Sequence, residues 1–266
     1  MSSVVSAIGD GVVVAKRNLI KIKRIPDLLI WTTMSPIMFV LLFGYVFGSS
    51  IDIPGTNYRE FLIAGVFAQT IIFGASGTGV SMAEDMTKGV IDRFRSLPMA
   101  RSAVLIGRTG ADIADNSISL FVMAITGLLV GWRIRTSALE AVVGFLVLLL
   151  FAYSFSWIMA YVGLKVASVE VVQNSSFMFI FPLTFVANTF VRGDLLPGPL
   201  KAFADWNPVS SVAQAAREAF GNTGSLPAPE VWSLANPIAY TLIWCAIILT
   251  IFVPLSVRQY NKAAAK

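Results

Sequence analysis

Six stretches of the chain contain no Asp, Glu, Lys or Arg, and they cover half of its 266 residues: 28–48, 61–83, 116–132, 141–164, 171–191 and 231–257. An apolar helix of about 20 residues rises about 1.5 Å per residue and crosses the roughly 30 Å hydrocarbon core of a bilayer. We therefore predict an all-α, polytopic membrane protein that forms a single transmembrane domain over residues 1–266. The six predicted spans are about 28–48, 61–83, 112–132, 140–164, 171–191 and 232–257.

Composition excludes other classes of protein. A soluble enzyme would disperse its apolar residues at helix or strand periods, and a transmembrane β-barrel would show short alternating segments. The chain has no histidine, and its one cysteine, Cys245, lies in the last span. The usual general base, the commonest zinc ligand and a disulfide framework are therefore all missing. We expect a chain that is not an enzyme and that binds no metal or cofactor of its own.

The amino-terminal residues 8–25 combine an apolar stripe with a basic side, which predicts an amphipathic helix in the headgroup plane. The stripe consists of Ile8, Val12, Ala15, Leu19 and Ile22. A disordered basic arm is the alternative.

Basic residues predict the orientation. With a cytoplasmic amino terminus, 14 of the 20 Lys and Arg residues fall inside the cell, so the positive-inside rule places both termini in the cytoplasm. The net charge of +5 then belongs to a surface that faces anionic lipid, and nucleic acid is not expected as a partner.

Two segments between predicted spans contain more apolar residues than a merely soluble loop would need. The cytoplasmic segment 84–101 holds Phe94 and Leu97 among charges, and Glu84 and Asp85 suit the first turn of a short helix there. The external segment 194–221 contains a helix signal, with Asn207 as cap and Gly221 as stop. We expect short re-entrant helices that dip into the outer leaflet or cover the outer mouth, with a surface helix as the alternative.

Residues 74–81, GASGTGVS, have the spacing of a phosphate-binding loop, but Val80 stands at the lysine position. Small residues in an apolar span are typical of close helix packing instead. We expect Ala75 and Gly79 to face another helix.

Asp112 and Asp115 lie three residues apart, on one helical face where the third span begins. We predict structural pairing with Arg108 or with Arg101. A proton relay is the alternative, and it would make the chain a proton-coupled secondary transporter.

The fifth span mixes amides and hydroxyls with phenyl rings, a combination that suits an amphiphilic organic ligand better than an ion. Its predicted path residues are Asn174, Phe181, Phe185 and Asn188. Packing between helices is the alternative, and a serine nucleophile of an intramembrane enzyme is a more remote one.

Four segments carry a resemblance to a known family: AKRNLIKIKRIPDLL (15–29), LLFGYVFG (41–48), EDMTKGVIDRFRSLPMAR (84–101) and DLLPGPLKAFADWNPVSSVAQAAREAFG (194–221). In this order they resemble the type-2 ABC exporter permeases, and within these the daunorubicin/doxorubicin-resistance branch. The resemblance covers nearly the whole chain.

The resemblance implies a homodimer of six-span subunits with two copies of a separate ATPase subunit, which holds ATP and Mg. The helix at 8–25 would be the connecting helix and 84–101 the coupling helix, and spans two and five would line the path, with Gln69 and Phe73 in span two. The family pattern in the coupling helix falls on Glu84, Gly89, Asp92, Pro98 and Arg101, around the apolar pair Phe94 and Leu97. Many members carry glutamate at the position of Asp92.

The expected function is therefore that of a permease subunit in a bacterial plasma membrane, which exports hydrophobic or amphiphilic compounds and confers multidrug efflux or antibiotic resistance. The alternative cargo is a lipid, a glycolipid or a polysaccharide.

Overall fold

The computed structural model describes residues 34, 36–47, 55, 57–89, 103–166, 168–190, 193, 196–225 and 227–263. Every regular element within these ranges is helical, as predicted. The predicted helix at 8–25 and most of the segment 84–101 lie outside them. The elements are η1 (Phe43–Phe47), α3 (Tyr58–Thr87), α5 (Ala103–Val130), α6 (Ala138–Lys165), α7 (Val169–Phe185), α8 (Gly198–Trp206), α9 (Pro208–Phe220), α10 (Trp232–Ala235) and α11 (Pro237–Ala263).

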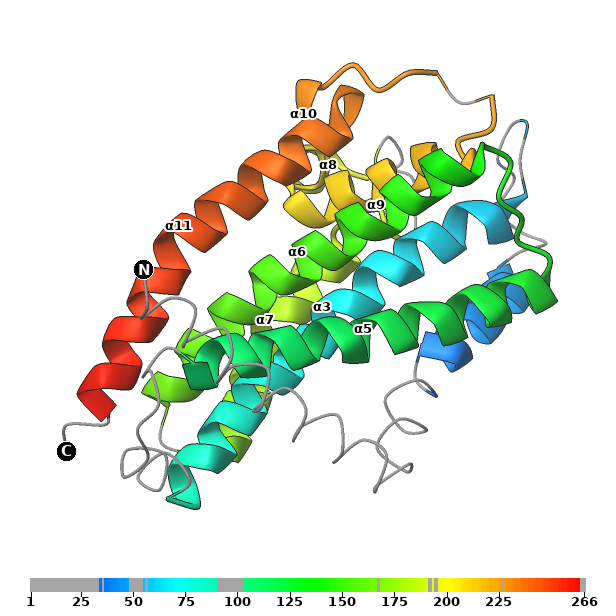
Figure 1. Cartoon of the computed structure of the whole chain (residues 1–266). Helices are drawn as coiled ribbons and strands as arrows, with labels where there is room; N and C mark the ends of the chain where they lie inside the picture. Colours follow the sequence, from blue (N-terminus) through cyan, green and yellow to red (C-terminus); the bar gives the residue numbers. More distant parts are fainter. Residues whose placement is uncertain are drawn as a thin grey trace.

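The long helices run side by side, and the short helices α8, α9 and α10 gather at one end of them (Figure 1). We call this the Tyr58 end, because α3 begins there, and the opposite one the Thr87 end. Helix α3 packs against α5, α6, α7 and α9. Of the 18 most apolar consecutive residues of α3, 78% are buried, whereas only 22% of the corresponding residues of α11 are buried. Helix α3 is therefore the centre of the bundle, whereas α11 presents most of its surface outward.

Four helices are long and apolar enough to cross a membrane: Tyr58–Thr87, Leu105–Val130, Ala138–Lys165 and Pro237–Lys262. They correspond to the second, third, fourth and sixth predicted spans. Of the first predicted span, the structure describes an apolar helix over Pro36–Val46.

Three predicted boundaries are wrong. Helix α3 continues to Thr87, so Glu84 and Asp85 lie in its last turns and do not begin a new helix. Helix α5 begins at Ala103, which places Asp112 within the helix. The fifth span was predicted to reach residue 191, but α7 ends at Phe185. Pro182 has no backbone N–H and lies in the last turn of α7, and residues 186–190 follow as bends and turns.

Helix α9 has the predicted ends. The Asn207 side chain accepts a hydrogen bond from the Val209 N–H at 2.9 Å, and Gly221 ends the helix with φ 70°. A positive φ favours glycine at this position. The polar side of α9 is buried as well as its apolar stripe, with only Glu218 exposed. A surface helix is thereby excluded, because α9 packs among α3, α6 and α11.

Glycine allows α3 to lie against α6 at backbone distance. A Cβ added at Gly163 would collide with the carbonyl oxygen of Gly79, and a Cβ at Gly79 would lie 2.8 Å from the carbonyl oxygen of Met159. Ala75 is also buried. The prediction that Ala75 and Gly79 pack against another helix is confirmed.

We predict that Gly163→Ala destabilises the bundle by about 1–3 kcal/mol, the usual cost of overpacking a filled interior. The added methyl group must push α6 away from α3, because its neighbour there is backbone. Thermal unfolding of the purified protein in detergent measures the effect. Gly110→Ala is the matched control, since a Cβ at Gly110 has no neighbour within 4 Å. Equal unfolding temperatures for the two variants would contradict the packing.

Candidate functional site

Helix α7 has one buried side and one apolar exposed side. Val172, Ser176, Ile180 and Thr184 recur every four residues and are buried. The exposed side carries the large apolar side chains of Val171, Phe177, Met178, Phe179 and Phe181, which are 40–73% exposed, together with the amides of Gln173 and Asn174. The hydroxyls of Ser176 and Thr184 donate to carbonyl oxygens one turn back in the same helix, at 2.6 and 2.8 Å. These hydroxyls are therefore satisfied without a ligand.

Seven phenylalanine rings form a continuous series beside this face. Successive ring centroids lie 6.4, 5.2, 4.1, 4.9, 4.8 and 5.7 Å apart, which is contact distance for aromatic pairs. We call this series the aromatic ladder. It runs Phe73, Phe177, Phe181, Phe185, Phe190, Phe43 and Phe39, and so connects α3, α7, the chain after α7 and the helix that ends in η1.

The predicted path residues are only partly brought together. Phe73, Phe181 and Phe185 belong to the aromatic ladder. Asn174 is exposed on α7, and Gln69 is buried in α3, 4% exposed. Asn188 is separate from the exposed face of α7, because its side chain binds a buried arginine.

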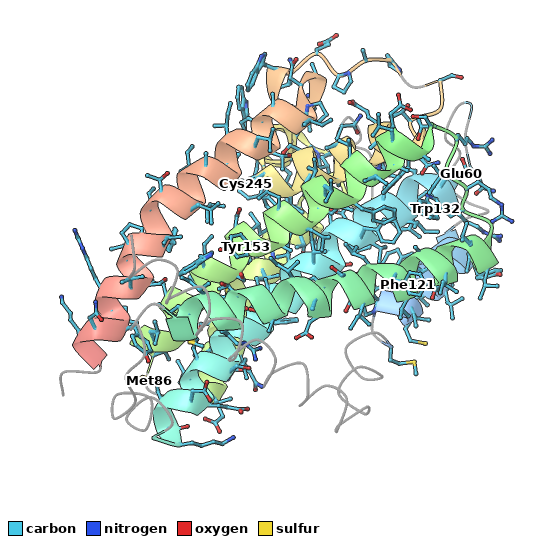
Figure 2. All side chains as sticks on the ribbon, in the orientation of Figure 1. Glu60, Met86, Phe121, Trp132, Tyr153 and Cys245 are labelled. Carbon is cyan, nitrogen blue, oxygen red and sulfur yellow. The ribbon has the colours of Figure 1, made fainter. Side chains whose placement is uncertain are left out.

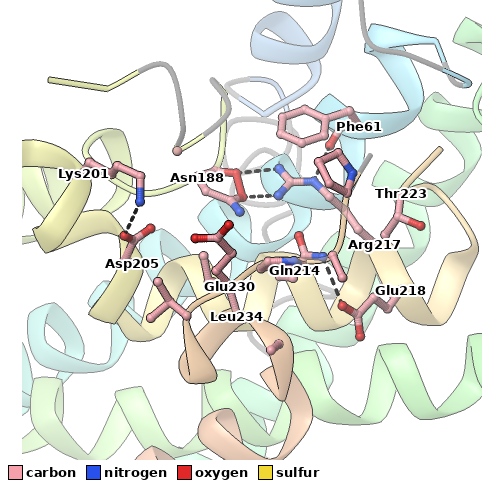
Figure 3. Close-up of a pocket in the computed structure, with 16 residues that line it drawn as sticks. Phe61, Asn188, Lys201, Asp205, Gln214, Arg217, Glu218, Thr223, Glu230 and Leu234 are labelled. Atoms are coloured by element: carbon pink, nitrogen blue, oxygen red, sulfur yellow. Dashed lines mark hydrogen bonds and ion pairs between the residues drawn. The ribbon is translucent and has the colours of Figure 1, made fainter. Parts of the chain in front are cut away.

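That arginine, Arg217 of α9, is fully buried. Its Nε donates to the carbonyl oxygen of Phe61 at 3.0 Å, and its Nη2 donates to those of Asn188 at 2.6 Å and Thr189 at 3.1 Å. Its Nη1 donates to the side-chain oxygen of Asn188 (Figure 3). The guanidinium also stacks on the Phe61 ring, 3.6 Å from its centroid. Arg217 thus joins α3, α9 and the chain after α7 through uncharged acceptors.

Burial lowers the pKa of the Arg217 guanidinium to about 9, an effect that the nearby Tyr58 opposes. The side chain therefore keeps its charge at pH 7. Sequence reasoning counted Arg217 only as an external basic residue. One sequence signal could have placed it. Arg217 follows Ala213 by four residues and precedes Phe220 by three, so it shares a helix face with these two buried apolar residues of α9.

A cavity of about 590 Å³ lies next to Arg217 at the Tyr58 end. Its charged wall includes the ion pair of Lys201 with Asp205, at 2.8 Å, together with Glu218 and Glu230 (Figure 3). Glu218 is exposed as a whole residue, but its carboxyl is partly buried in the cavity wall, and this burial raises its pKa, although a hydrogen bond from Gln214 acts in the opposite direction. Its mixed charges and the apolar residues from Pro227 to Ala235 give the cavity an amphiphilic lining.

Further bonds close the same end. Arg135 donates to both carboxylate oxygens of Glu60, at 2.9 and 2.7 Å, and this pairing raises the pKa of Arg135. The indole of Trp132 donates to Asn222 at 2.6 Å. Figure 2 shows Glu60 and Trp132 at this end of the bundle and Met86 at the other.

Toward the Thr87 end, the predicted pairing of Asp112 with Arg108 is present, with Nη2 3.2 Å from Oδ1. Asp112 is 4% exposed, and its other oxygen accepts a hydrogen bond from Thr78 of α3. Asp115 lies one turn further along α5, and its Oδ1 is buried with no hydrogen-bond partner in the described ranges. Thr78 was placed by sequence only among small packing residues, so its bond across the two helices was missed.

The predicted coupling residues are described in part. Glu84 forms an ion pair with Lys88 at 3.1 Å, and Gly89 follows the end of α3 with φ 63°. Asp92, Phe94, Leu97, Pro98 and Arg101 lie outside the described residues. Within the described part of the chain, no group of three or more His, Cys, Asp or Glu side chains is placed to hold a metal ion.

We predict that Arg217→Met lowers the free energy of unfolding by roughly 3 kcal/mol, because buried oxygens lose their donors and methionine supplies none. Thermal unfolding in detergent measures the loss. Lys201→Met is the control, since that pair is partly exposed and such pairs contribute about 0–1 kcal/mol. If the two variants unfold at the same temperature, the buried contacts of Arg217 do not hold this end together.

Comparison with known proteins agrees with this architecture. The family model described as ABC-2 type transporter matches residues 11–220. The daunorubicin resistance ABC transporter permease protein DrrB1 of Streptomyces coeruleorubidus is 33% identical over 249 residues, which are 94% of this chain and 85% of that protein. The "probable doxorubicin resistance ABC transporter permease protein DrrC" of Mycobacterium tuberculosis is 23% identical over 231 residues, 86% of this chain and 80% of that protein. The family match extends from residue 11 to the end of α9, which is more than half of the chain, and the chain belongs to the ABC-2 type transporter family.

Proposed function

We propose that this chain is the membrane-spanning permease subunit of an ATP-driven exporter of hydrophobic or amphiphilic compounds of the drug or antibiotic type. The observation that carries the proposal is the exposed face of α7 together with the aromatic ladder. The flat rings provide a surface for the apolar part of a cargo molecule, and the neighbouring amides of α7 can bind its polar groups.

The energy for export comes from a separate ATPase subunit. Residues 74–81, the one stretch with phosphate-loop spacing, lie within α3 against other helices, and Val80 replaces the required lysine. The permeases related to this chain belong to ABC transporters, whose energy source is ATP. Two copies of the ATPase subunit, with ATP and Mg, are the partners that this proposal requires.

A second copy of the chain completes the path. The exposed face of α7 carries Phe177, Met178 and Phe179, which are 57%, 71% and 73% exposed. Apolar surface of this size is covered either by lipid or by protein. In the proposed dimer, the α7 faces of the two copies enclose a path that runs along the aromatic ladder, with Phe73 of α3 beside it.

The Thr87 end lies in the cytoplasm in this proposal, because the segment that follows Thr87 is one of those that hold 14 of the 20 Lys and Arg residues, and the positive-inside rule assigns these segments to the inside. The ATPase contact then comprises Glu84, Gly89, Asp92, Phe94, Leu97, Pro98 and Arg101. The Tyr58 end faces outward, and α8, α9 and α10 form its gate. Arg217 acts as an anchor of that gate, so Asn188 is assigned to the anchor and no longer to the path.

We predict that Phe177→Ala and Phe181→Ala weaken drug export, each by up to about tenfold in apparent affinity, since an aromatic contact contributes about 0.5–1.5 kcal/mol. Accumulation of fluorescent daunorubicin in cells that express the complex measures export. Phe121→Ala is the matched control, because Phe121 is 67% exposed on α5 and takes no part in the ring contacts of the aromatic ladder. Equal effects of all three changes would contradict the proposed path. If the wild type leaves drug accumulation unchanged and alters surface lipid or glycan, the alternative cargo replaces the drug.

We predict that replacing Phe94 and Leu97 with Asp abolishes binding of the ATPase subunit, because apolar contacts in a protein interface are lost when charges replace them. Copurification of the ATPase with the tagged permease is the measurement. Phe203→Asp in α8 is the control: it makes the same exchange at a 48% exposed phenylalanine at the Tyr58 end. Retention of the ATPase by the double variant would remove this segment from the contact.

A further inference from the structure

Helix α5 is the next described helix after α3, and the two are hydrogen-bonded to each other at two depths. At the Tyr58 end, Nη1 of Arg59 donates to the carbonyl oxygen of Val130 at 3.3 Å. Near the Thr87 end, the hydroxyl of Thr78 in α3 donates to the carboxylate of Asp112 in α5. The two hydrogen bonds therefore oppose sliding of one helix along the other at two separate levels.

Thr78 differs from the other threonines of α3 and α5 that are buried or half-buried. Thr70, Thr109 and Thr126 each donate to a carbonyl oxygen one turn back in their own helix, at 2.7, 3.0 and 2.9 Å. That is the usual arrangement of threonine in a membrane helix. Thr78 instead donates to a charged acceptor on the neighbouring helix.

The acceptor makes this bond costly to break. Thr78 is fully buried and Asp112 is 4% exposed, so the carboxylate cannot exchange the hydroxyl for bulk water. Arg108 neutralises its charge from within α5, and only Thr78 reaches it from α3 in the described ranges. A buried carboxylate that loses a donor retains an unsatisfied oxygen, which is more costly in the membrane than in water.

At the same place, a side chain of α5 lies against the backbone of α3. A Cβ added to Gly74 would lie 2.5 Å from the side-chain oxygen of Asn116, so glycine leaves room for this amide against α3. Asn116 in turn donates to the carbonyl oxygen of Asp112 at 2.8 Å. On its other side, α3 meets α6 through backbone and apolar atoms at Gly79, Gly163 and Met159. Apolar contacts can shift in register without leaving a charge unsatisfied.

We propose that Thr78 and Asp112 form a clamp that makes α3 and α5 move as one body. This inference rests on the proposed function, in which the ATPase contacts the chain between these two helices. With the clamp closed, a displacement of the ends of α3 and α5 moves both helices relative to α6 and α7. With the clamp open, the displacement is absorbed between α3 and α5. Thr78 is thus a positioning residue for transport.

The first experiment compares Thr78→Val, Thr78→Ser and Thr70→Val in proteoliposomes that contain the permease and its copurified ATPase, with daunorubicin as cargo. We expect Thr78→Val to retain ATP hydrolysis while transport per ATP falls about tenfold, the effect on an equilibrium of losing a hydrogen bond to a charged acceptor. Thr78→Ser keeps the hydroxyl and restores the wild-type ratio. Thr70→Val removes only a bond within α3 and leaves the ratio unchanged. Equal transport per ATP for Thr78→Val and Thr70→Val overturns the proposal.

The second experiment detects the clamp without cargo or ATPase. Spin labels are attached to Thr87→Cys and Gly110→Cys in a Cys245→Ser background; Thr87 is exposed and Gly110 has open space for a side chain. We expect one narrow distance distribution in the parent, a broader one with Thr78→Val, and no change with Thr70→Val. An unchanged distribution with Thr78→Val overturns the clamp. If the wild type neither transports daunorubicin nor binds an ATPase, the proposed function fails, and the distance distribution still decides whether the clamp exists.

Discussion

The buried guanidinium of Arg217 determines how the Tyr58 end of the bundle is built. Its N–H groups donate to uncharged oxygens, from Phe61 in α3 and from Asn188 and Thr189 after α7, and its plane stacks on the Phe61 ring. A fully buried cation in such a cage is stable only when every one of these groups stays in place, because the loss of one acceptor leaves charge unsolvated. The cage also satisfies carbonyl oxygens that α7 leaves free by ending at Phe185. One side chain thereby closes the bundle and ends the helix beside the proposed path.

The contacts of α3 consequently differ in kind. At the Tyr58 end, polar bonds connect segments far apart in sequence, including Arg135 with Glu60 and Trp132 with Asn222. At Gly79, α3 and α6 meet through glycine and apolar atoms, which resist separation but contain few directional bonds. At the adjacent Thr78, the bond to Asp112 supplies a directional contact with α5. A permease that must change shape requires this kind of division between fixed and adjustable contacts.

Part of this architecture could be predicted from sequence. Charge-free stretches identify the long helices, Asn207 and Gly221 mark the ends of α9, and the spacing of Arg108 and Asp112 predicts their ion pair, because these signals are local. The end of α7 could not be predicted, since the charge-free run continues past Phe185 and the partner that satisfies the free carbonyls, Arg217, is 28 and 29 residues further along the chain. The same separation explains why Asn188 was assigned to the path. The start of α5 was predicted too late in the chain. Hydropathy counts Arg108 and Asp112 as separate charges and cannot show that they neutralise each other inside the helix.

In the proposed permease α7 crosses the membrane, and its shortness then has a consequence for the surrounding lipid. A helix of 17 residues extends about 25 Å, roughly 5 Å less than an average hydrocarbon core. Such hydrophobic mismatch is relieved when the bilayer thins locally, and lipids with shorter or more disordered chains collect where it does. The aromatic ladder would then border a thinned strip of membrane, in which an amphiphile is already displaced toward one interface. Local thinning of the bilayer would thus lower the free-energy barrier that the cargo of the proposed permease has to cross.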